Sequence, residues 1–343
     1  MNLPRDPPVA RDEFDAALIP GFREAVRGDY VALEQAWQHT WSDALDAEGR
    51  LAQGAAVERD CPLCAAPGSA SRLHFVKLGM RIVSCLGCAF TYSRDVLKPE
   101  LDRALYQRSS AQSSYRDLKR NAAYRELEEK KCRYILQQAL RYLGAPGSLL
   151  DIGIGAGRLI AAALAAGWKP LGVEADPVFA AEARAAGLTV IDGFFPPALG
   201  GPSRYDLVTM LDVIEHSVDP VLLLREARAR LAPGGVLAIQ VPNFDSLVVR
   251  LEGPANSNFC HGHWNYFVAG SLERTARLAG LEMLDVRTII SELDRLAPFA
   301  VEEVARLSVE LTGAVPPAGG PTADWLHANH LGYKLLGYFR ARR

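Results

Sequence analysis

The sequence predicts an α/β protein whose main domain is built on a doubly wound, mostly parallel sheet. From residue 146 onward, short apolar runs alternate with helical patterns, which is typical of strands followed by crossover helices. The first run, residues 148–152, leads into three glycines, Gly153, Gly155 and Gly157, and then into an Ala- and Leu-rich helix over 158–166. A strand, a glycine turn and a helix form the opening unit of a doubly wound nucleotide fold.

The first 57 residues are acidic and are predicted to be a helical extension. Helical patterns cover residues 12–26 and 30–52, with Gly28 between them. Leu33 and Trp37 fall at helical spacing and are expected to pack against the rest of the protein. We assign no chemistry to this extension.

Residues 58–95 carry two C-x₂-C pairs with 20 residues between them. This spacing is typical of a zinc site with four cysteine ligands. Such a closed tetrahedron has no open position, so we expect a structural Zn²⁺ rather than a catalytic one. The strand-like runs between the pairs predict a zinc ribbon. The four expected ligands are Cys61, Cys64, Cys85 and Cys88.

Residues 96–145 are predicted to form a helical linker or lid. Helical patterns cover residues 99–105 and 116–143. The polar segment between them, residues 109–115, is either a mobile cover over a bound ligand or a plain linker.

The fourth part of the chain, residues 146–343, holds the sheet. Five apolar runs are expected to be parallel strands: residues 149–152, 170–174, 189–192, 206–211 and 236–241. Residues 281–289 and 330–340 are candidates for a sixth and a seventh strand. Between these two lie a predicted helix over 292–311 and a Gly/Pro loop over 313–321.

The glycine turn differs from a dinucleotide-binding fingerprint. Its pattern is D-x-G-x-G-x-G, which is one residue shorter between the last two glycines than G-x-G-x-x-G. The acid, Asp151, would repel a pyrophosphate and suits a cationic ligand. The alternative is a turn with a purely structural role. The stretch resembles the first motif of class I S-adenosylmethionine-dependent methyltransferases, whose cofactor carries an ammonium and a sulfonium.

Further acidic residues stand where this family binds the rest of its cofactor. Glu174 lies at the tip of the second strand, where an acid can accept both ribose hydroxyls. The resemblance implies that Ala175 borders the adenine and that Asp192, at the end of the third strand, lies near the adenine amino group. Leu211 and Asp212 end the fourth strand, at the edge where doubly wound folds bind ligands.

The segment after the fourth strand strengthens the resemblance. Residues 212–220 read D-x-x-E-H-x-x-D-P, similar to the fourth motif of small-molecule methyltransferases related to the ubiquinone-type enzymes, and residues 231–235 form the turn L-A-P-G-G. The resemblance covers about residues 117–343. It implies a Rossmann-like methyltransferase with a seven-stranded sheet whose last strand is antiparallel.

Glu215 and His216 are the first candidates for catalysis. Transfer from a sulfonium needs alignment, and a hydroxyl or acidic C–H acceptor also needs a base. A neighbouring carboxylate would raise the pKa of His216 and orient its ring. In sugar C-methyltransferases with a comparable four-cysteine segment, this pair is associated with proton abstraction. The alternative is that His216 only caps the following helix.

A second group of polar side chains follows the fifth strand. His261, His263 and Tyr266 are candidates to bind or deprotonate the acceptor, because this loop closes over the acceptor in the family. Two histidines at this spacing also suggest a metal, but no third ligand stands nearby in sequence. The alternative is that residues 263–267 begin the next helix.

The leading function is therefore methylation of a small molecule, a sugar nucleotide or a secondary-metabolite intermediate, at oxygen or carbon. Residues 61–148 hold 15 Lys and Arg against 7 Asp and Glu, which suits an anionic substrate or is simply a solvated face. A zinc-containing RNA methyltransferase is an alternative, but no run of basic and aromatic residues crosses the ribbon. A non-catalytic scaffold that binds the cofactor is a second alternative, disfavoured by Asp151 and Glu174.

The sequence gives no indication of a membrane partner. No apolar run approaches the ~20 residues that span a bilayer. The N-terminus lacks the apolar run of a secretory signal. We expect a cytoplasmic protein with free thiols at Cys132 and Cys260.

Overall fold

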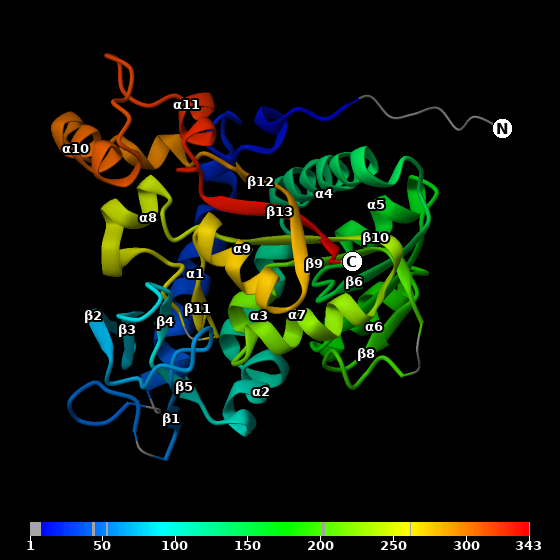
Figure 1. Ribbon diagram of the computed structural model, residues 1–343, viewed down its shortest axis with the longest axis horizontal. Helices are drawn as coiled ribbons and strands as arrows, with labels where there is room; N and C mark the ends of the chain where they lie inside the picture. Colours follow the sequence, from blue (N-terminus) through cyan, green and yellow to red (C-terminus); the bar gives the residue numbers. More distant parts are fainter. Residues whose placement is uncertain (1–7, 43–44, 53, 201–202, 261, 343) are drawn as a thin grey trace.

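The computed structural model describes residues 8–42, 45–52, 54–200, 203–260 and 262–342. Its centre is a seven-stranded sheet with the order β12-β13-β10-β9-β6-β7-β8 (Figure 1). The pairs from β8 to β10 are parallel, whereas β13 is antiparallel to both of its neighbours. The predicted doubly wound sheet, with an antiparallel last strand, is confirmed. Its strands are β6 (Ser148–Ile152), β7 (Lys169–Glu174), β8 (Val190–Asp192), β9 (Tyr205–Leu211), β10 (Leu231–Pro242), β12 (Leu281–Ile289) and β13 (Lys334–Ala341).

Apolar side chains cover both faces of this sheet. Successive residues of a strand point to opposite faces, and Leu149 and Leu150 accordingly belong to different buried clusters. Because both faces are buried, the central strands read as continuous apolar runs. The helices that follow these strands are α5 (Arg158–Ala165), α6 (Pro177–Ala185), α7 (Pro220–Ala229) and α9 (Ala269–Leu278).

The ribbon forms a separate sheet that borrows a strand from the larger domain. Its order is β11-β4-β3-β2, where β11 pairs with β4 through Asn265 opposite Tyr92 and Tyr266 opposite Thr91. The ribbon is therefore anchored to the loop that follows β10. Its strands are β2 (Ser71–Lys77), β3 (Met80–Cys85), β4 (Thr91–Ser93) and β11 (Asn265–Tyr266), and a second small pair joins β1 (Ala56–Glu58) to β5 (Asp95–Leu97).

The N-terminal extension contains one long helix, α1 (Phe22–Ser42), after the short 3₁₀ helix η1 (Arg11–Phe14). The predicted division at Gly28 is wrong, because α1 continues through this residue. A glycine inside a helix costs about 1 kcal/mol. Burial of Phe22 and Val26 in a cluster shared with the next long helix offsets that cost.

Three helices lead from the ribbon to the large sheet. The predicted loop over 109–115 is wrong, since a helix begins at Ser110 and the Ser109 hydroxyl caps it by accepting the Gln112 N–H (3.0 Å). Gln112 and Arg116 then bind the carboxylate of Asp176, both at 2.9 Å. The predicted helix over 116–143 is divided at Asn121, whose side chain caps the last helix. These helices are α2 (Pro99–Arg108), α3 (Ser110–Arg120) and α4 (Ala122–Leu143).

The remaining helices follow the carboxyl end of β10 or lie between β12 and β13 in the sequence. The segment between the last two has no regular structure, as its Gly and Pro content predicts. Among the described residues, no helix is long and apolar enough to cross a membrane. These helices are α8 (Leu247–Glu252), η3 (Gly253–Ala255), η4 (Leu293–Leu296), α10 (Val301–Thr312) and α11 (Ala323–Ala328).

Candidate functional site

The glycine turn leaves room for a ligand at the carboxyl end of β6. Gly153, Gly155 and Gly157 have φ angles of 76°, 51° and 73°, which L-residues with a side chain rarely adopt. A Cβ on Gly153 would lie 2.6 Å from Val213 Cγ2, so this glycine allows close packing. A Cβ on Gly155 would meet no atom within 4 Å. The turn therefore presents bare backbone to open space at Gly155.

Asp151 is buried directly before this turn. The Thr209 hydroxyl, on the neighbouring strand β9, donates a 2.6 Å hydrogen bond to its carboxylate. Burial raises the pKa of Asp151 to about 7, and the bond from Thr209 opposes this shift. A buried carboxylate with a raised pKa is stabilised by a cation that binds beside it.

Glu174 joins the glycine turn to the end of β7. Its carboxylate accepts hydrogen bonds from the Gly155 N–H (2.7 Å) and the Asp176 N–H (2.8 Å). Burial raises its pKa to about 7. Asp192 is the register partner of Glu174 on β8 and is exposed, while Ala175 is half-buried beside them. Together with Leu211 and Asp212 at the end of β9, the predicted cofactor residues thus lie at the ends of four adjacent strands, β9, β6, β7 and β8.

Asp212 follows Leu211 at the end of β9 and has a φ of 55°. Lys334 Nζ lies 2.8 Å from one carboxylate oxygen, and Gln240 Nε2 donates to the other at 2.9 Å. The ammonium of Lys334 holds the pKa of Asp212 well below its usual range, against the effect of burial. Sequence analysis missed Lys334 and Gln240, because only the adjacency of β9, β10 and β13 brings them here.

Glu215 and His216 lie just beyond, in the 3₁₀ helix η2 (Ile214–His216). Glu215 is 1 % exposed, and neither carboxyl oxygen accepts a hydrogen bond from another described residue. The expectation that Glu215 raises the pKa of His216 is wrong: burial lowers that pKa to about 4. The physical reason is that burial also raises the pKa of Glu215, which removes the negative charge that would stabilise an imidazolium. His216 also does not cap α7, since Asp219 does.

His263 completes this group from a distant part of the chain. Its ring centroid lies 4.7 Å from that of His216, with the rings at 78°. Its Nδ1 is 2.9 Å from the Asn258 carbonyl oxygen, which assigns the proton to Nδ1 and the lone pair to Nε2. One donor atom each from Glu215, His216 and His263 lies within 4.8 Å of the other two. The predicted site residue His261 lies outside the described residues.

Hydrogen bonds to backbone carbonyl oxygens hold η2 and the loop that carries His263 together. The Trp264 N–H donates to the Glu215 carbonyl oxygen (2.8 Å), and Asn265 Nδ2 donates to the Ser217 carbonyl oxygen (2.6 Å). The Tyr266 hydroxyl donates to the His263 carbonyl oxygen (2.9 Å). The expected helix start at residues 263–267 is not formed, because 265 and 266 belong to β11.

Arg59 ties the ribbon to the same two segments. Its half-buried guanidinium donates to the carbonyl oxygens of Ser93 (2.9 Å), Val218 (2.9 Å) and Trp264, and lies 5.3 Å from the centre of the Tyr92 ring. Burial lowers its pKa to about 10. No sequence signal marks this residue, because a single arginine before a C-x₂-C pair fits many roles.

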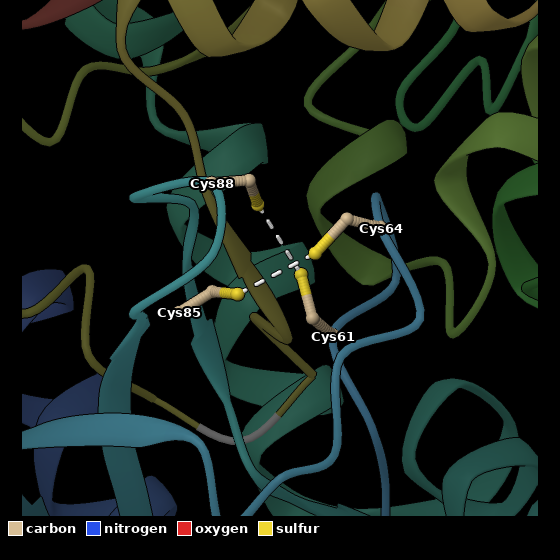
Figure 2. A group of neighbouring side chains, drawn as sticks. All are labelled: Cys61, Cys64, Cys85 and Cys88. Atoms are coloured by element: carbon tan, nitrogen blue, oxygen red, sulfur yellow. Dashed lines mark hydrogen bonds between the residues drawn. The ribbon is translucent and has the colours of Figure 1, made fainter.

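The four ribbon cysteines converge on one point (Figure 2). The Sγ atoms of Cys61 and Cys88, and those of Cys64 and Cys85, are 3.5 Å apart, and all four lie within 4.8 Å of one another. Four thiolates at ~2.3 Å from a zinc ion form a tetrahedron with edges of about 3.8 Å. The arrangement therefore fits a tetrahedral metal ion.

Comparisons with known proteins detect a methyltransferase domain in the chain. Residues 124–286 match a family model described as a methyltransferase domain. No curated protein sequence matches the chain.

Similar solved structures include three methyltransferase systems. A chain of the complex between the Haloferax volcanii Trm112 methyltransferase activator and a methyltransferase is 19% identical, covering 66% of this chain and 98% of that one, with a TM-score of 0.46. The Burkholderia thailandensis 1,6-didemethyltoxoflavin-N1-methyltransferase is 17% identical, and the match covers 79% of this chain and 100% of that one, with a TM-score of 0.45. An S-adenosylmethionine-dependent methyltransferase from Clostridium acetobutylicum is 11% identical, with 67% and 99% covered and a TM-score of 0.45.

The family match begins in α4 and ends in β12. It therefore takes in the glycine turn, Glu174 and the segment with Glu215 and His216. The strand order of the sheet, with the antiparallel β13 between β10 and β12, is the one that the sequence resemblance implies. The chain therefore contains a methyltransferase domain, which the family match places at residues 124–286.

Proposed function

We propose that this enzyme methylates an oxygen or carbon atom of a small molecule, a sugar nucleotide or a secondary-metabolite intermediate. The observation that carries the proposal is the group of Glu215, His216 and His263 at the end of β9. Strands β6 and β9 are parallel neighbours, so their carboxyl ends lie at the same edge of the sheet. The polar group and the glycine turn therefore face one site.

The cofactor half of this site uses the two acids of raised pKa. Asp151 would bind the cationic part of S-adenosylmethionine, and the open space beside Gly155 would receive the chain that links it to the ribose. Glu174 would accept the ribose hydroxyls with the remaining lone pairs of its carboxylate, which two backbone N–H groups hold in place. Ala175, Asp192 and Leu211 would border the adenosine. The bound cofactor supplies a methyl group on a sulfonium, which is a good leaving group.

The acceptor half must remove a proton. His216 is neutral at pH 7, since burial lowers its pKa to about 4, and a neutral imidazole has a lone pair for the proton of an acceptor hydroxyl. The oxygens of Glu215 accept no hydrogen bond from another described residue, so they can bond the acceptor. His263 lies across from His216 and closes this end.

Buried lysines favour an anionic acceptor. Lys119 and Lys131 both contact the same oxygen of Glu128, at 2.8 and 3.2 Å, which leaves one positive charge in excess. The charges of both lysines also lower the pKa of Asp212, which follows the end of β9. A phosphate or carboxylate on the acceptor would neutralise this excess.

The ribbon has a supporting role in this proposal. Cys61, Cys64, Cys85 and Cys88 would hold a Zn²⁺ ion in a closed site that takes no part in methyl transfer. The ion would fix the ribbon, whose strand β4 and Arg59 hold the loop of His263 in place.

The test combines cofactor binding with product detection. Calorimetric titration with S-adenosylmethionine should give one site per chain, and Glu174→Gln should weaken it about tenfold or more, because an ionised acceptor of two hydroxyl bonds is lost. Formation of S-adenosylhomocysteine is then followed with a panel of sugar nucleotides and phenolic metabolites, with His216→Ala as the comparison. A chain that binds no cofactor, or a His216→Ala variant with the full rate, contradicts the proposal.

A further inference from the structure

The group of Glu215, His216 and His263 has the composition of a metal site that is distinct from the four cysteines. Two imidazoles and one carboxyl group lie with one donor atom each within 4.8 Å of the others. Two histidines and one carboxylate are a common ligand set for catalytic zinc and for non-haem iron. Sequence analysis found no third ligand for the histidines of the 260–267 loop, and the fold supplies two donors from η2.

The hydrogen bonds around these donors match those of metal ligands. A histidine that binds a metal almost always donates its other ring N–H to a carboxylate, carbonyl or water. His263 does so through Nδ1, which lies 2.9 Å from the Asn258 carbonyl oxygen. His216 is hydrogen-bonded to the backbone of Gly262. Each ring is therefore held by a backbone group, and Nε2 of His263 is directed away from its backbone partner.

Glu215 provides the independent sign of a missing partner. Its side chain is buried, and neither oxygen accepts a hydrogen bond from another described residue. A buried carboxyl group without a partner costs about 1–3 kcal/mol or more. Such a group persists where a ligand completes it, and a cation between Glu215 and the two rings would do so.

We propose that Glu215, His216 and His263 bind a divalent transition-metal cation such as Zn²⁺. The donor set favours zinc, iron or cobalt over Mg²⁺ and Ca²⁺, which prefer oxygen ligands alone. Three protein ligands leave an open position, in contrast to the closed four-cysteine site. An acceptor hydroxyl bound there would have a lowered pKa and would release its proton to water, so with the cation bound His216 would serve as a ligand and not as the base.

The surrounding charges tolerate this cation. The ammonium of Lys334 acts on both histidines, but Asp212 binds it at 2.8 Å and balances its charge. Glu215 would lose its proton when the cation binds. The three ligands would then carry one negative charge toward the cation, which favours binding.

The metal content of the full chain tests the proposal. After loading with Zn²⁺ and removal of unbound metal, the wild type should hold two zinc ions per chain by elemental analysis. Glu215→Gln and His263→Ala should hold one, and their affinity for the second ion should fall by at least about tenfold. His330→Asn, which changes an exposed histidine outside the group, should keep two. A wild type with one ion, or a Glu215→Gln variant with two, contradicts the proposal.

Cobalt shows which site is filled. Co²⁺ at the cysteines gives a thiolate charge-transfer band together with ligand-field bands, whereas Co²⁺ at Glu215, His216 and His263 gives ligand-field bands without thiolate charge transfer. In the wild type a second equivalent of Co²⁺ should therefore add ligand-field absorption without further charge transfer. Glu215→Gln should show only the spectrum of the cysteine site, and a Glu215→Gln variant that keeps the added absorption overturns the assignment.

This inference rests on the proposed function, and the two can fail separately. Calorimetry with S-adenosylhomocysteine reports on the cofactor half in every variant and also shows that the variant is folded. A wild type that binds the cofactor and methylates an acceptor with one zinc ion per chain contradicts only the cation. A chain with two zinc ions and no cofactor binding contradicts the proposed function.

Discussion

The two groups of side chains that can ligate a metal, the ribbon cysteines and the Glu215–His216–His263 group, are assembled in different ways. Each pair of cysteines lies in one tight turn, and the two turns are joined by the antiparallel pairing of β2 with β3. The second group combines η2 with a loop that lies 47 residues later, counted from His216 to His263. Short-range geometry therefore fixes the first group, and tertiary packing fixes the second.

This difference matches the roles that we propose for the two groups. Four thiolates would close a tetrahedron around the ion and leave no position for a substrate. Three donors at the carboxyl end of a parallel sheet would leave one position for a substrate, at the edge where doubly wound folds bind ligands. Arg59 connects the two, because it leaves the ribbon and bonds the carbonyl oxygens of Val218 and Trp264. We infer that the cysteine site of the ribbon supports the Glu215–His216–His263 group.

Removal of one ribbon ligand should have the largest effect. Cys85→Ser should lose the structural zinc ion, and because binding of such an ion contributes ~10 kcal/mol to folding in zinc peptides, it should destabilise the chain by several kcal/mol. Thermal unfolding and zinc content measure this. Cys132→Ala, at a buried cysteine outside the ribbon, should keep the ion. A Cys85→Ser variant with the melting temperature of the wild type would show that the ribbon cysteines do not stabilise the chain.

Arg59→Met should have the next largest effect and should lower the free energy of unfolding by about 3 kcal/mol. The substitution removes three hydrogen bonds from the guanidinium to carbonyl oxygens, and a typical bond contributes about 1 kcal/mol. Denaturant unfolding measures the loss. Arg72→Met, at an exposed ribbon position, is the matched control and should change stability by less than about 0.5 kcal/mol. Equal unfolding midpoints for the two variants would show that Arg59 does not join the ribbon to the larger domain.

Glu215→Met should move stability the other way. It replaces a buried carboxyl group that lacks a partner on another residue with an apolar side chain, so the metal-free chain should gain about 1–2 kcal/mol while methyl transfer is lost. Unfolding in a chelator and the rate of S-adenosylhomocysteine formation measure the two effects. A less stable variant that keeps its activity would show that Glu215 serves packing.

The pH dependence of cofactor binding should show the smallest effect. Burial raises the pKa of Asp151 and Glu174 to about 7, and a cationic cofactor binds the ionised forms. Affinity should therefore fall by up to about tenfold per group for each pH unit below 7. These pKa values exceed the usual values of 3.8 for Asp and 4.5 for Glu, so the ligand-free chain should lose stability as pH rises from about 4 to 7. Calorimetry and melting across this range check both trends, and an affinity that rises toward low pH would contradict them.

Apolar runs and short residue spacings predict those parts of the fold that depend on neighbouring residues in the sequence. The strands, the glycine turn and the four cysteines follow from runs and spacings within the sequence, and all appear where expected. Gly28 and residues 109–115 were predicted as breaks, but both lie in helices. Propensity was overridden there by the burial of Phe22 and Val26 and by the bonds from α3 to Asp176.

Contacts between distant segments could not be predicted in this way. The pairing of Lys334 with Asp212 depends on the order of β9, β10 and β13. The position of His263 beside His216 depends on Asn265, which lies in β11 and bonds the carbonyl oxygen of Ser217. The sequence shows each residue, but nothing in its neighbourhood indicates the partner.

A crystal structure of the full chain with S-adenosylhomocysteine tests most directly whether the two halves form one active site. We expect the ribose hydroxyls on Glu174 and the amino group near Asp151, with the sulfur directed toward Glu215, His216 and His263. A nucleoside bound away from Glu174, or a sulfur that faces away from this group, would contradict the account.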